Sequence, residues 1–243
     1  MKKLKWDIVF EDESLMLINK PSGLLTIPDR YDPLKPNLYN SLQSYREAIF
    51  INHRLDRETS GLIVFSKTEA SHKFMQEQFE KKKISKSYLT IVNGSMPASS
   101  GVIELKMSPS SSGKKLMVID KKGKNSSSYY EVVTAWKNYS LVKVDIATGR
   151  THQIRLHMKT MGCPIVCDTL YGDGEPFYLS RIKRKYHKTA FEEERPLINR
   201  VALHAHRLSF IHPETKKVQT FEADPPKDMQ ATINQLNKLN IES

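Results

Sequence analysis

The chain has little cysteine and no long apolar run. Cys163 and Cys167 are its two cysteines, and they lack the paired CxxC spacing of a zinc site. We therefore interpret them as reduced, buried thiols and expect no metal. No apolar run approaches the ~20 residues that span a bilayer, and the opening MKKLKWDIVFEDES is too polar for a signal-peptide core. The sequence thus predicts a cytoplasmic protein that does not bind membranes.

Glycine-rich phosphate loops are also missing. Neither GxGxxG nor GxxxxGK[ST] occurs, so a bound nucleotide is not expected, and we predict a protein without a cofactor.

Acidic residues are fewer than basic ones. Lys and Arg number 38 against 27 Asp and Glu, which gives a formal net charge of +11. A polyanion such as nucleic acid is the commonest partner of so basic a protein. The simpler reading, that the charge only aids solubility, remains open at this point.

Short strands separated by turns dominate the pattern. Two runs, 6–10 and 15–20, flank an acidic turn and predict a hairpin, and further strands are expected at 62–67, 87–94, 101–105, 115–120, 128–136, 140–148, 201–213 and 217–223. Many strands with few helices favour an α+β fold around a mostly antiparallel mixed sheet flanked by helices. We predict one domain over 1–243, with a charged insertion at about 172–200.

Four helices are predicted from apolar spacing and caps. Asn37 would cap a helix with Leu38, Leu42, Tyr45 and Ile49 on one side; Thr68 would cap one with Ala70, Phe74, Met75 and Phe79. Thr151 is the expected N-cap of a third, which carries an Ile154, Met158 and Met161 stripe and ends at Gly162 and Pro164. The last helix would begin near Pro226.

One polar loop carries a candidate catalytic group. The segment HRLDRETSG, residues 53–61, places Asp56 among two arginines and a histidine. Basic neighbours hold a carboxylate ionised, so Asp56 can act as a nucleophile or a base without a metal. An isolated aspartate in a polar loop is more often a turn residue that caps its own backbone.

The same loop resembles a family signature. HRLDRETSG with the following LIVFSK resembles the HRLD motif of the RluA-type pseudouridine synthases. Four other segments resemble further motifs of that family and occur in the same order: EDESLMLINKPSGLL, KSYLTIVNG, ATGRTHQIRLHMKTMGCPIVCDTLYG and LHAHRLSFIHP. These matches span residues 8 to 213, which is nearly the whole chain.

The resemblance implies a pseudouridine synthase fold with a central catalytic cleft and an isomerisation of uridine in RNA. The catalytic residues it implies are Asp56, Tyr88 and Arg155. Whether Asp56 attacks the sugar, attacks the base or removes a sugar proton stays open. Tyr88 would stack on the uracil or handle a proton, and Arg155 would form a bidentate bond to Asp56. The alternatives are that Tyr88 is only an aromatic residue of the core and that Arg155 is a solvated residue on a helix surface.

The resemblance also implies RNA contacts. Arg54 would enter the space that the target base leaves, or contact a phosphate. The other side chains expected to bind RNA are Arg57, Lys86, Arg150 and His152. The basic run 181–188 follows RNA or is a solvated loop. No separate N-terminal RNA-binding domain is expected, so a compact tRNA or rRNA stem-loop is the predicted substrate of a monomeric enzyme.

Two features depart from the family pattern, and two other functions remain open. Cys167 stands where many members have glycine, and the insertion at 172–200 is longer than in many members. An RNA-binding protein without activity is one alternative. The other is a glycosidase, which needs a second carboxylate, and Glu58 beside Asp56 is poorly placed for that.

Overall fold

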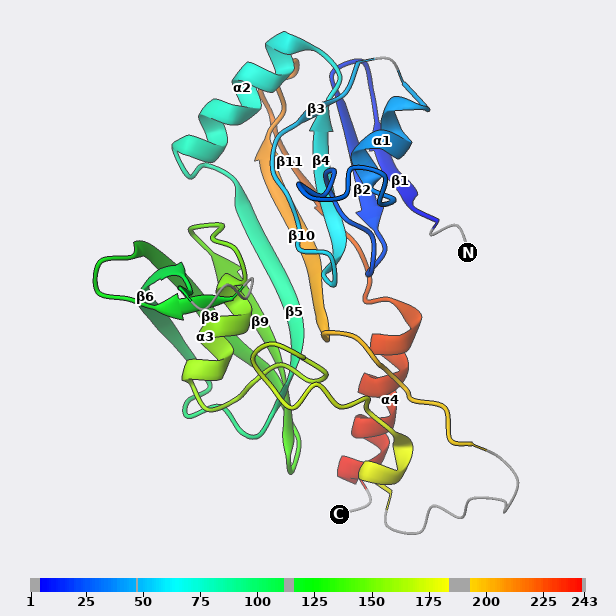
Figure 1. Cartoon of the computed structure of the whole chain (residues 1–243), viewed down its shortest axis with the longest axis vertical. Helices are drawn as coiled ribbons and strands as arrows, with labels where there is room; N and C mark the ends of the chain where they lie inside the picture. Colours follow the sequence, from blue (N-terminus) through cyan, green and yellow to red (C-terminus); the bar gives the residue numbers. More distant parts are fainter. Residues whose placement is uncertain (1–4, 47, 112–115, 184–192, 242–243) are drawn as a thin grey trace. The chain divides into compact units, whose positions relative to one another are not determined.

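The computed structural model describes residues 5–46, 48–111, 116–183 and 193–241, which form two compact units (Figure 1). Unit 1 comprises Met1–Tyr88 and His204–Asp224, and unit 2 comprises Leu89–Leu203 and Pro225–Ser243. Each unit is described by itself below. The single domain predicted for 1–243 stays a prediction, and the basic run 181–188 lies outside the described residues from position 184 on.

The order of helices and strands follows the predicted α+β pattern. In sequence the elements are β1 (Asp7–Glu11), β2 (Leu15–Lys20), α1 (Leu38–Gln43), β3 (Phe50–Ile51), β4 (Ser60–Ser66), α2 (Glu69–Glu80), β5 (Ser85–Asn93), β6 (Ser100–Pro109), β7 (Met117–Ile119), β8 (Lys124–Ala135), β9 (Tyr139–Ile146), α3 (Gln153–Thr160), the 3-10 turn η1 (Leu179–Arg181), β10 (Leu203–Ile211), β11 (Val218–Glu222) and α4 (Lys227–Ile241).

The sheet of unit 1 is mixed. Its strands run in the order β1-β2-β4-β10, with β3 also paired to β4 and β11 to β10. All these pairs are antiparallel except β4 with β10, which is parallel. The predicted hairpin of β1 and β2 is confirmed, as is the mostly antiparallel character of the sheet.

Apolar side chains of this sheet form a buried cluster with Met75 of α2. Helix α2 is the turquoise helix in Figure 1. β2 and β4 alternate in register, so Leu17 and Val64 stand opposite each other and point to the same face. The buried cluster on that face is Leu15, Leu17, Leu62, Val64, Met75, Ile84, Leu208, Phe210 and Ala223. Because its last three members come from 204–224, the core of unit 1 needs two segments that are far apart in the sequence.

Unit 2 is an antiparallel sheet with two helices. Its strands run in the order β9-β8-β6-β7, and α3 contacts β7 and β8 (Figure 1, green). Helix α4 is held by two polar contacts. The Trp136 indole donates to Asn237 at 2.9 Å, and Arg200 makes a bidentate pair with Asp228 at 2.7 Å for each bond.

Two of the predicted N-caps are confirmed and one is wrong. The side chains of Asn37 and Thr68 accept backbone N–H groups three residues ahead, and Thr68 forms a capping box with Ser71. The N-cap of α3 is His152, with φ 54°, in place of Thr151. No side chain of the described residues caps the first turn of α3; the Gln153 side-chain oxygen instead accepts the N–H of Arg150, which precedes the helix, at 3.1 Å.

Three other local predictions needed correction. Helix α1 ends at Gln43, six residues before the predicted Ile49. The short strand β3 was not predicted, since two residues carry no period. Ala70 is exposed, whereas Met75 on the predicted apolar side of α2 is fully buried.

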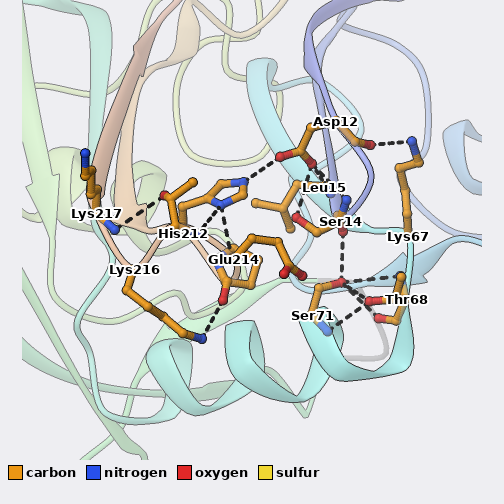
Figure 2. Close-up of polar contacts among 12 residues, drawn as sticks. Asp12, Ser14, Leu15, Lys67, Thr68, Ser71, His212, Glu214, Lys216 and Lys217 are labelled. Atoms are coloured by element: carbon orange, nitrogen blue, oxygen red, sulfur yellow. Dashed lines mark hydrogen bonds and ion pairs between the residues drawn. The ribbon is translucent and has the colours of Figure 1, made fainter.

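A polar cluster joins two turns of unit 1 to the start of α2 (Figure 2). The imidazole Nε2 of buried His212 lies 2.7 Å from the Asp12 carboxylate, whose other oxygen accepts the N–H of Leu15 at 2.8 Å. Ser71 donates to the Ser14 carbonyl at 2.8 Å. These contacts fasten the β1–β2 turn to the β10–β11 turn and to α2.

Within the part of the chain that the structure describes, no helix is both long and apolar enough to cross a bilayer.

Candidate active site

The Asp56 loop, residues 52–59, leaves the sheet between β3 and β4. Ile51 is the last residue of β3 and pairs with Phe65 of β4. At the next position, Val64, side chains of the loop form the hydrogen bonds to the β4 backbone. The Asn52 amide donates to the Val64 carbonyl at 3.4 Å, and the Val64 N–H donates to His53 Nε2 at 3.1 Å. The β4 backbone therefore keeps its hydrogen bonds while the chain turns away.

The segment 20–26 clamps the backbone of this loop. Lys20 is fully buried, and its ammonium donates to the carbonyls of Pro21, Leu24 and Arg57 at 3.0, 2.8 and 3.2 Å. The Thr26 hydroxyl donates to the Leu55 carbonyl at 2.8 Å and accepts the Leu55 N–H at 3.2 Å.

The clamp continues on the other side of Asp56. The Ser22 hydroxyl donates to the Glu58 carbonyl at 2.6 Å, and the Gly23 N–H donates to the Arg57 carbonyl at 2.8 Å. Residues on both sides of Asp56 are thus tied by hydrogen bonds to the end of β2 and the segment that follows it.

Gly61 explains the end of the HRLDRETSG motif. Its φ is +112°, and a Cβ placed on it would lie 2.3 Å from the Ala205 carbonyl oxygen of β10. Any side chain there would push β4 and β10 apart, so glycine is required at the base of the loop.

His53 is a neutral base beneath the loop. Burial, together with the positive charge of Lys86, lowers its pKa to about 3. Its ring packs on Phe79 with centroids 4.9 Å apart, and the Lys86 ammonium lies 5.7 Å from the same Phe79 ring. Burial also lowers the pKa of Lys86. The sequence did not predict this arrangement, in which Phe79 of α2 supports both side chains.

Tyr88 is buried on β5, with 8% of its surface exposed. Burial raises the pKa of its hydroxyl, and the negative charge of Asp56 raises it further. The phenol therefore keeps its proton at neutral pH. This electrostatic coupling brings together two of the three predicted catalytic residues within unit 1, and the Asp56 side chain itself is half-buried.

Arg54 and Arg57 flank Asp56 and are both exposed. The Arg57 guanidinium donates from Nε to the Gly23 carbonyl at 3.1 Å and lies 3.6 Å from the Glu58 carboxylate. Arg54 and Arg57 are the loop's two exposed cations, and the predicted RNA contacts of both stay predictions.

Arg155 lies in unit 2 and is 4% exposed, so the reading of a solvated helix arginine is wrong. Its Nε and Nη2 donate to the two oxygens of Asp168 at 2.7 and 2.6 Å, and Asp168 is fully buried. The sequence predicted a bidentate bond to Asp56 and did not predict Asp168 as a partner. The Nε–Nη2 edge of Arg155 is taken by Asp168, and the bond to Asp56 stays a prediction.

Tyr171 completes this group. The Arg155 guanidinium carbon lies 5.3 Å from the centroid of the Tyr171 ring. The Tyr171 hydroxyl accepts the Met117 N–H at 2.8 Å and lies 3.1 Å from His152 Nδ1. Asp168 and Tyr171 belong to the stretch CDTLYG, residues 167–172. The acidic Asp168 close to apolar residues was the feature of the sequence that could have indicated a buried ion pair.

The other predicted RNA-binding residues of unit 2 differ in exposure. Arg150 is exposed and donates from Nε to the Asn125 carbonyl at 3.3 Å, whereas His152 is half-buried against Tyr171. Their RNA contacts stay predictions.

Both cysteines are buried thiols. Cys163 donates to the Ser95 carbonyl and Cys167 to the Ile198 carbonyl, at 3.2 and 3.4 Å. Burial raises the pKa of Cys163, and it raises that of Cys167 to about 11. Cys167 has φ 60°, a left-handed conformation that explains the glycine of many family members at this position. Among the described residues, no three His, Cys, Asp or Glu side chains gather as metal ligands.

Known proteins resemble this chain over most of its length. A family model described as "RNA pseudouridylate synthase" matches residues 14–160. The "Ribosomal large subunit pseudouridine synthase D" of Zymomonas mobilis is 35% identical, over 95% of this chain and 72% of that protein. The "Uncharacterized RNA pseudouridine synthase YlyB" of Bacillus subtilis is 30% identical, over 96% of this chain and 73% of the relative.

A solved structure shares the fold. "Human RNA Pseudouridylate Synthase Domain Containing 4" superposes with a TM-score of 0.73 at 22% identity, over 95% of this chain and 92% of that one.

Proposed function

Because the chain belongs to the RNA pseudouridylate synthase family, we propose that it isomerises particular uridines of a structured RNA through Asp56. The observation that carries this proposal is the double clamp on the Asp56 loop. Lys20, Ser22 and Thr26 bind the backbone on both sides of Asp56, so the carboxylate is presented in one place. Such preorganisation is what a reaction at a single sugar–base bond requires.

The reaction breaks the bond from ribose C1′ to uracil N1, turns the base and joins C1′ to C5. C5 loses a proton and N1 takes one up, so the composition of the nucleoside is unchanged. No oxidant, reductant or net water is consumed. Asp56 supplies the carboxylate, which attacks the sugar or base or removes a proton. Tyr88 keeps its proton because its pKa is raised, so we assign it stacking and hydrogen bonding rather than the role of a phenolate base. We propose that Arg155 serves the same reaction, on the strength of the TGRTHQIR motif.

The proposed substrate is ribosomal or transfer RNA. Several relatives carry the name of large-subunit ribosomal synthases, and the net charge of +11 suits a polyanion. Arg54 is exposed beside Asp56, and we propose that it occupies the space of the extruded base. We further propose a cytoplasmic monomer that needs no cofactor.

The test is site mapping with two loop variants. Wild type, Asp56→Asn and the neighbouring carboxylate variant Glu58→Gln are incubated with unmodified ribosomal and transfer RNA transcripts. Pseudouridine is then mapped by carbodiimide-blocked primer extension. New stops with wild type and Glu58→Gln but not with Asp56→Asn are expected. Normal stops with Asp56→Asn would refute the assignment, and free uracil in the mixture would instead indicate glycosidase chemistry.

A further inference from the structure

Arg155 is held along one edge and across one face. Its edge is paired with Asp168 through two short hydrogen bonds, and its plane lies over the Tyr171 ring. A planar guanidinium fixed in both ways has a single orientation. The orientation of the Arg155 guanidinium is therefore set by Asp168 and Tyr171.

Asp168 is itself fixed by the backbone that follows it. Its Oδ1 accepts the N–H groups of Leu170 and Tyr171 at 2.9 and 3.0 Å, in addition to Arg155 Nη2 at 2.6 Å. The Asp168 N–H donates to the Ile165 carbonyl at 3.2 Å, and the Gly172 N–H donates to the Asp168 carbonyl at 2.9 Å. The carboxylate is thus part of a closed turn, and it cannot follow Arg155 if the arginine moves.

Tyr171 links this turn to two other elements. Besides facing Arg155, its buried hydroxyl binds the Met117 N–H of β7 and the imidazole of His152, the residue that precedes α3. The ring also packs with Leu156 and Met107 in a small apolar cluster. One side chain therefore sets the spacing of β7, the start of α3 and the plane of the guanidinium.

We propose that Asp168 and Tyr171 are positioning residues that aim Arg155 for the isomerisation. This inference rests on the proposed function, in which Arg155 is catalytic. A buried ion pair contributes little net stability compared with apolar residues of equal size, so orientation is the better account of its presence. A displacement of one ångström in a catalytic group can reduce a rate by about 100-fold.

Unit 2 offers a matched control. Arg200 and Asp228 form the same bidentate pair through Nε and Nη2, at 2.7 Å for each bond, and tie α4 to the segment before β10. Neither residue lies in a motif that resembles the family signature. Asp228→Asn removes the same charge from the same bidentate geometry, in a pair whose aspartate side chain is 34% exposed, and so reports what the loss of such an ion pair does to stability when Arg155 keeps its partner.

The experiment separates rate from binding. Large-subunit ribosomal RNA and tRNA transcripts labelled with [5-³H]uridine are mixed with excess enzyme, and tritium release gives the single-turnover rate. Filter binding gives the RNA Kd, and thermal melting gives stability. We expect the rate to fall about 100-fold in Asp168→Asn and about tenfold in Tyr171→Phe, with Kd within about threefold of wild type. Asp228→Asn should melt earlier and keep a rate within about twofold of wild type.

The outcomes are distinguishable. A wild-type rate in folded Asp168→Asn and in Tyr171→Phe overturns the inference. An equal rate loss in Asp228→Asn also overturns it, because the effect would then come from general destabilisation. If Asp168→Asn does not fold, Tyr171→Phe decides alone, since it removes one oxygen and keeps the ring. No tritium release by wild type on either RNA refutes the proposed function and this inference with it. Normal release by Arg155→Met refutes the proposed role of Arg155 and this inference, and leaves the isomerisation through Asp56 standing.

Discussion

His53 should make the protein less stable as the pH falls below neutrality. In the folded chain burial holds its pKa at about 3, while an unfolded histidine titrates near 6.5. Above pH 7 both states are neutral and His53 adds no pH dependence. Below pH 6.5 the unfolded chain takes up a proton that the folded chain does not, so stability falls with pH.

The magnitude can be worked out at pH 5. The unfolded histidine then lies about 1.5 pH units below its pKa, which corresponds to about 2 kcal/mol at ~1.36 kcal/mol per unit. The His53 side chain keeps some exposed surface, so water screens part of the shift. Even a folded pKa of about 4 leaves the ring neutral at pH 5, and the figure holds.

The assay is urea unfolding of wild type and His53→Gln at pH 7.5 and 5. Glutamine can still accept the Val64 N–H but does not titrate. The free energy of unfolding of wild type should drop by about 2 kcal/mol more than that of the variant. His157, whose pKa burial lowers to about 4, acts equally in both proteins and cancels. Parallel losses in the two proteins would refute the reasoning.

Three further changes test the site and its unit. Tyr88→Phe should keep RNA binding and at least about a tenth of the tritium-release rate, because the phenol already stays protonated; a complete loss would show that its proton is essential. Thr26→Val removes both bonds to Leu55 and should cost about 2 kcal/mol in urea unfolding, together with a slower single-turnover rate; an unchanged rate would separate the clamp from catalysis. Burial alone would raise the pKa of Asp12, but the N–H groups of the following turn outweigh it and lower the pKa. Asp12→Asn should therefore cost about 1–2 kcal/mol at pH 7, and the difference from wild type should fade as the pH falls below 3.8, which melting curves at pH 7 and 3 would check.

The sequence predicted the strands and the candidate loop well because both depend on local chemistry. Asn37 and Thr68 act as caps through neighbours three residues away, and β4 is buried throughout with an apolar run at its centre. Short elements fared worse, since β3 has two residues and α1 stops after six. A period needs several turns before it can be recognised.

Side-chain partners that a turn brings together could not be predicted from the sequence. Asp168 reaches Arg155 from thirteen residues away through a turn that includes a left-handed cysteine. The identity of a guanidinium's partner depends on that turn, and no spacing rule reveals it. Lys20 is a similar case, because a lysine in a strand is expected to be exposed. Here its side chain is buried, and its ammonium donates hydrogen bonds to three backbone carbonyls.

The discontinuity of unit 1 has a consequence for synthesis of the protein. Residues 5–88 carry Asp56, its clamp and Tyr88, yet the cluster that supports them includes Leu208, Phe210 and Ala223. During translation the loop segment leaves the ribosome long before the strands that close its core. A chain stopped before His204 would contain every residue of the Asp56 loop, but the apolar face of its sheet would be exposed to water. Such a chain is expected to bind chaperones or to be degraded by proteases, and not to act as a smaller enzyme.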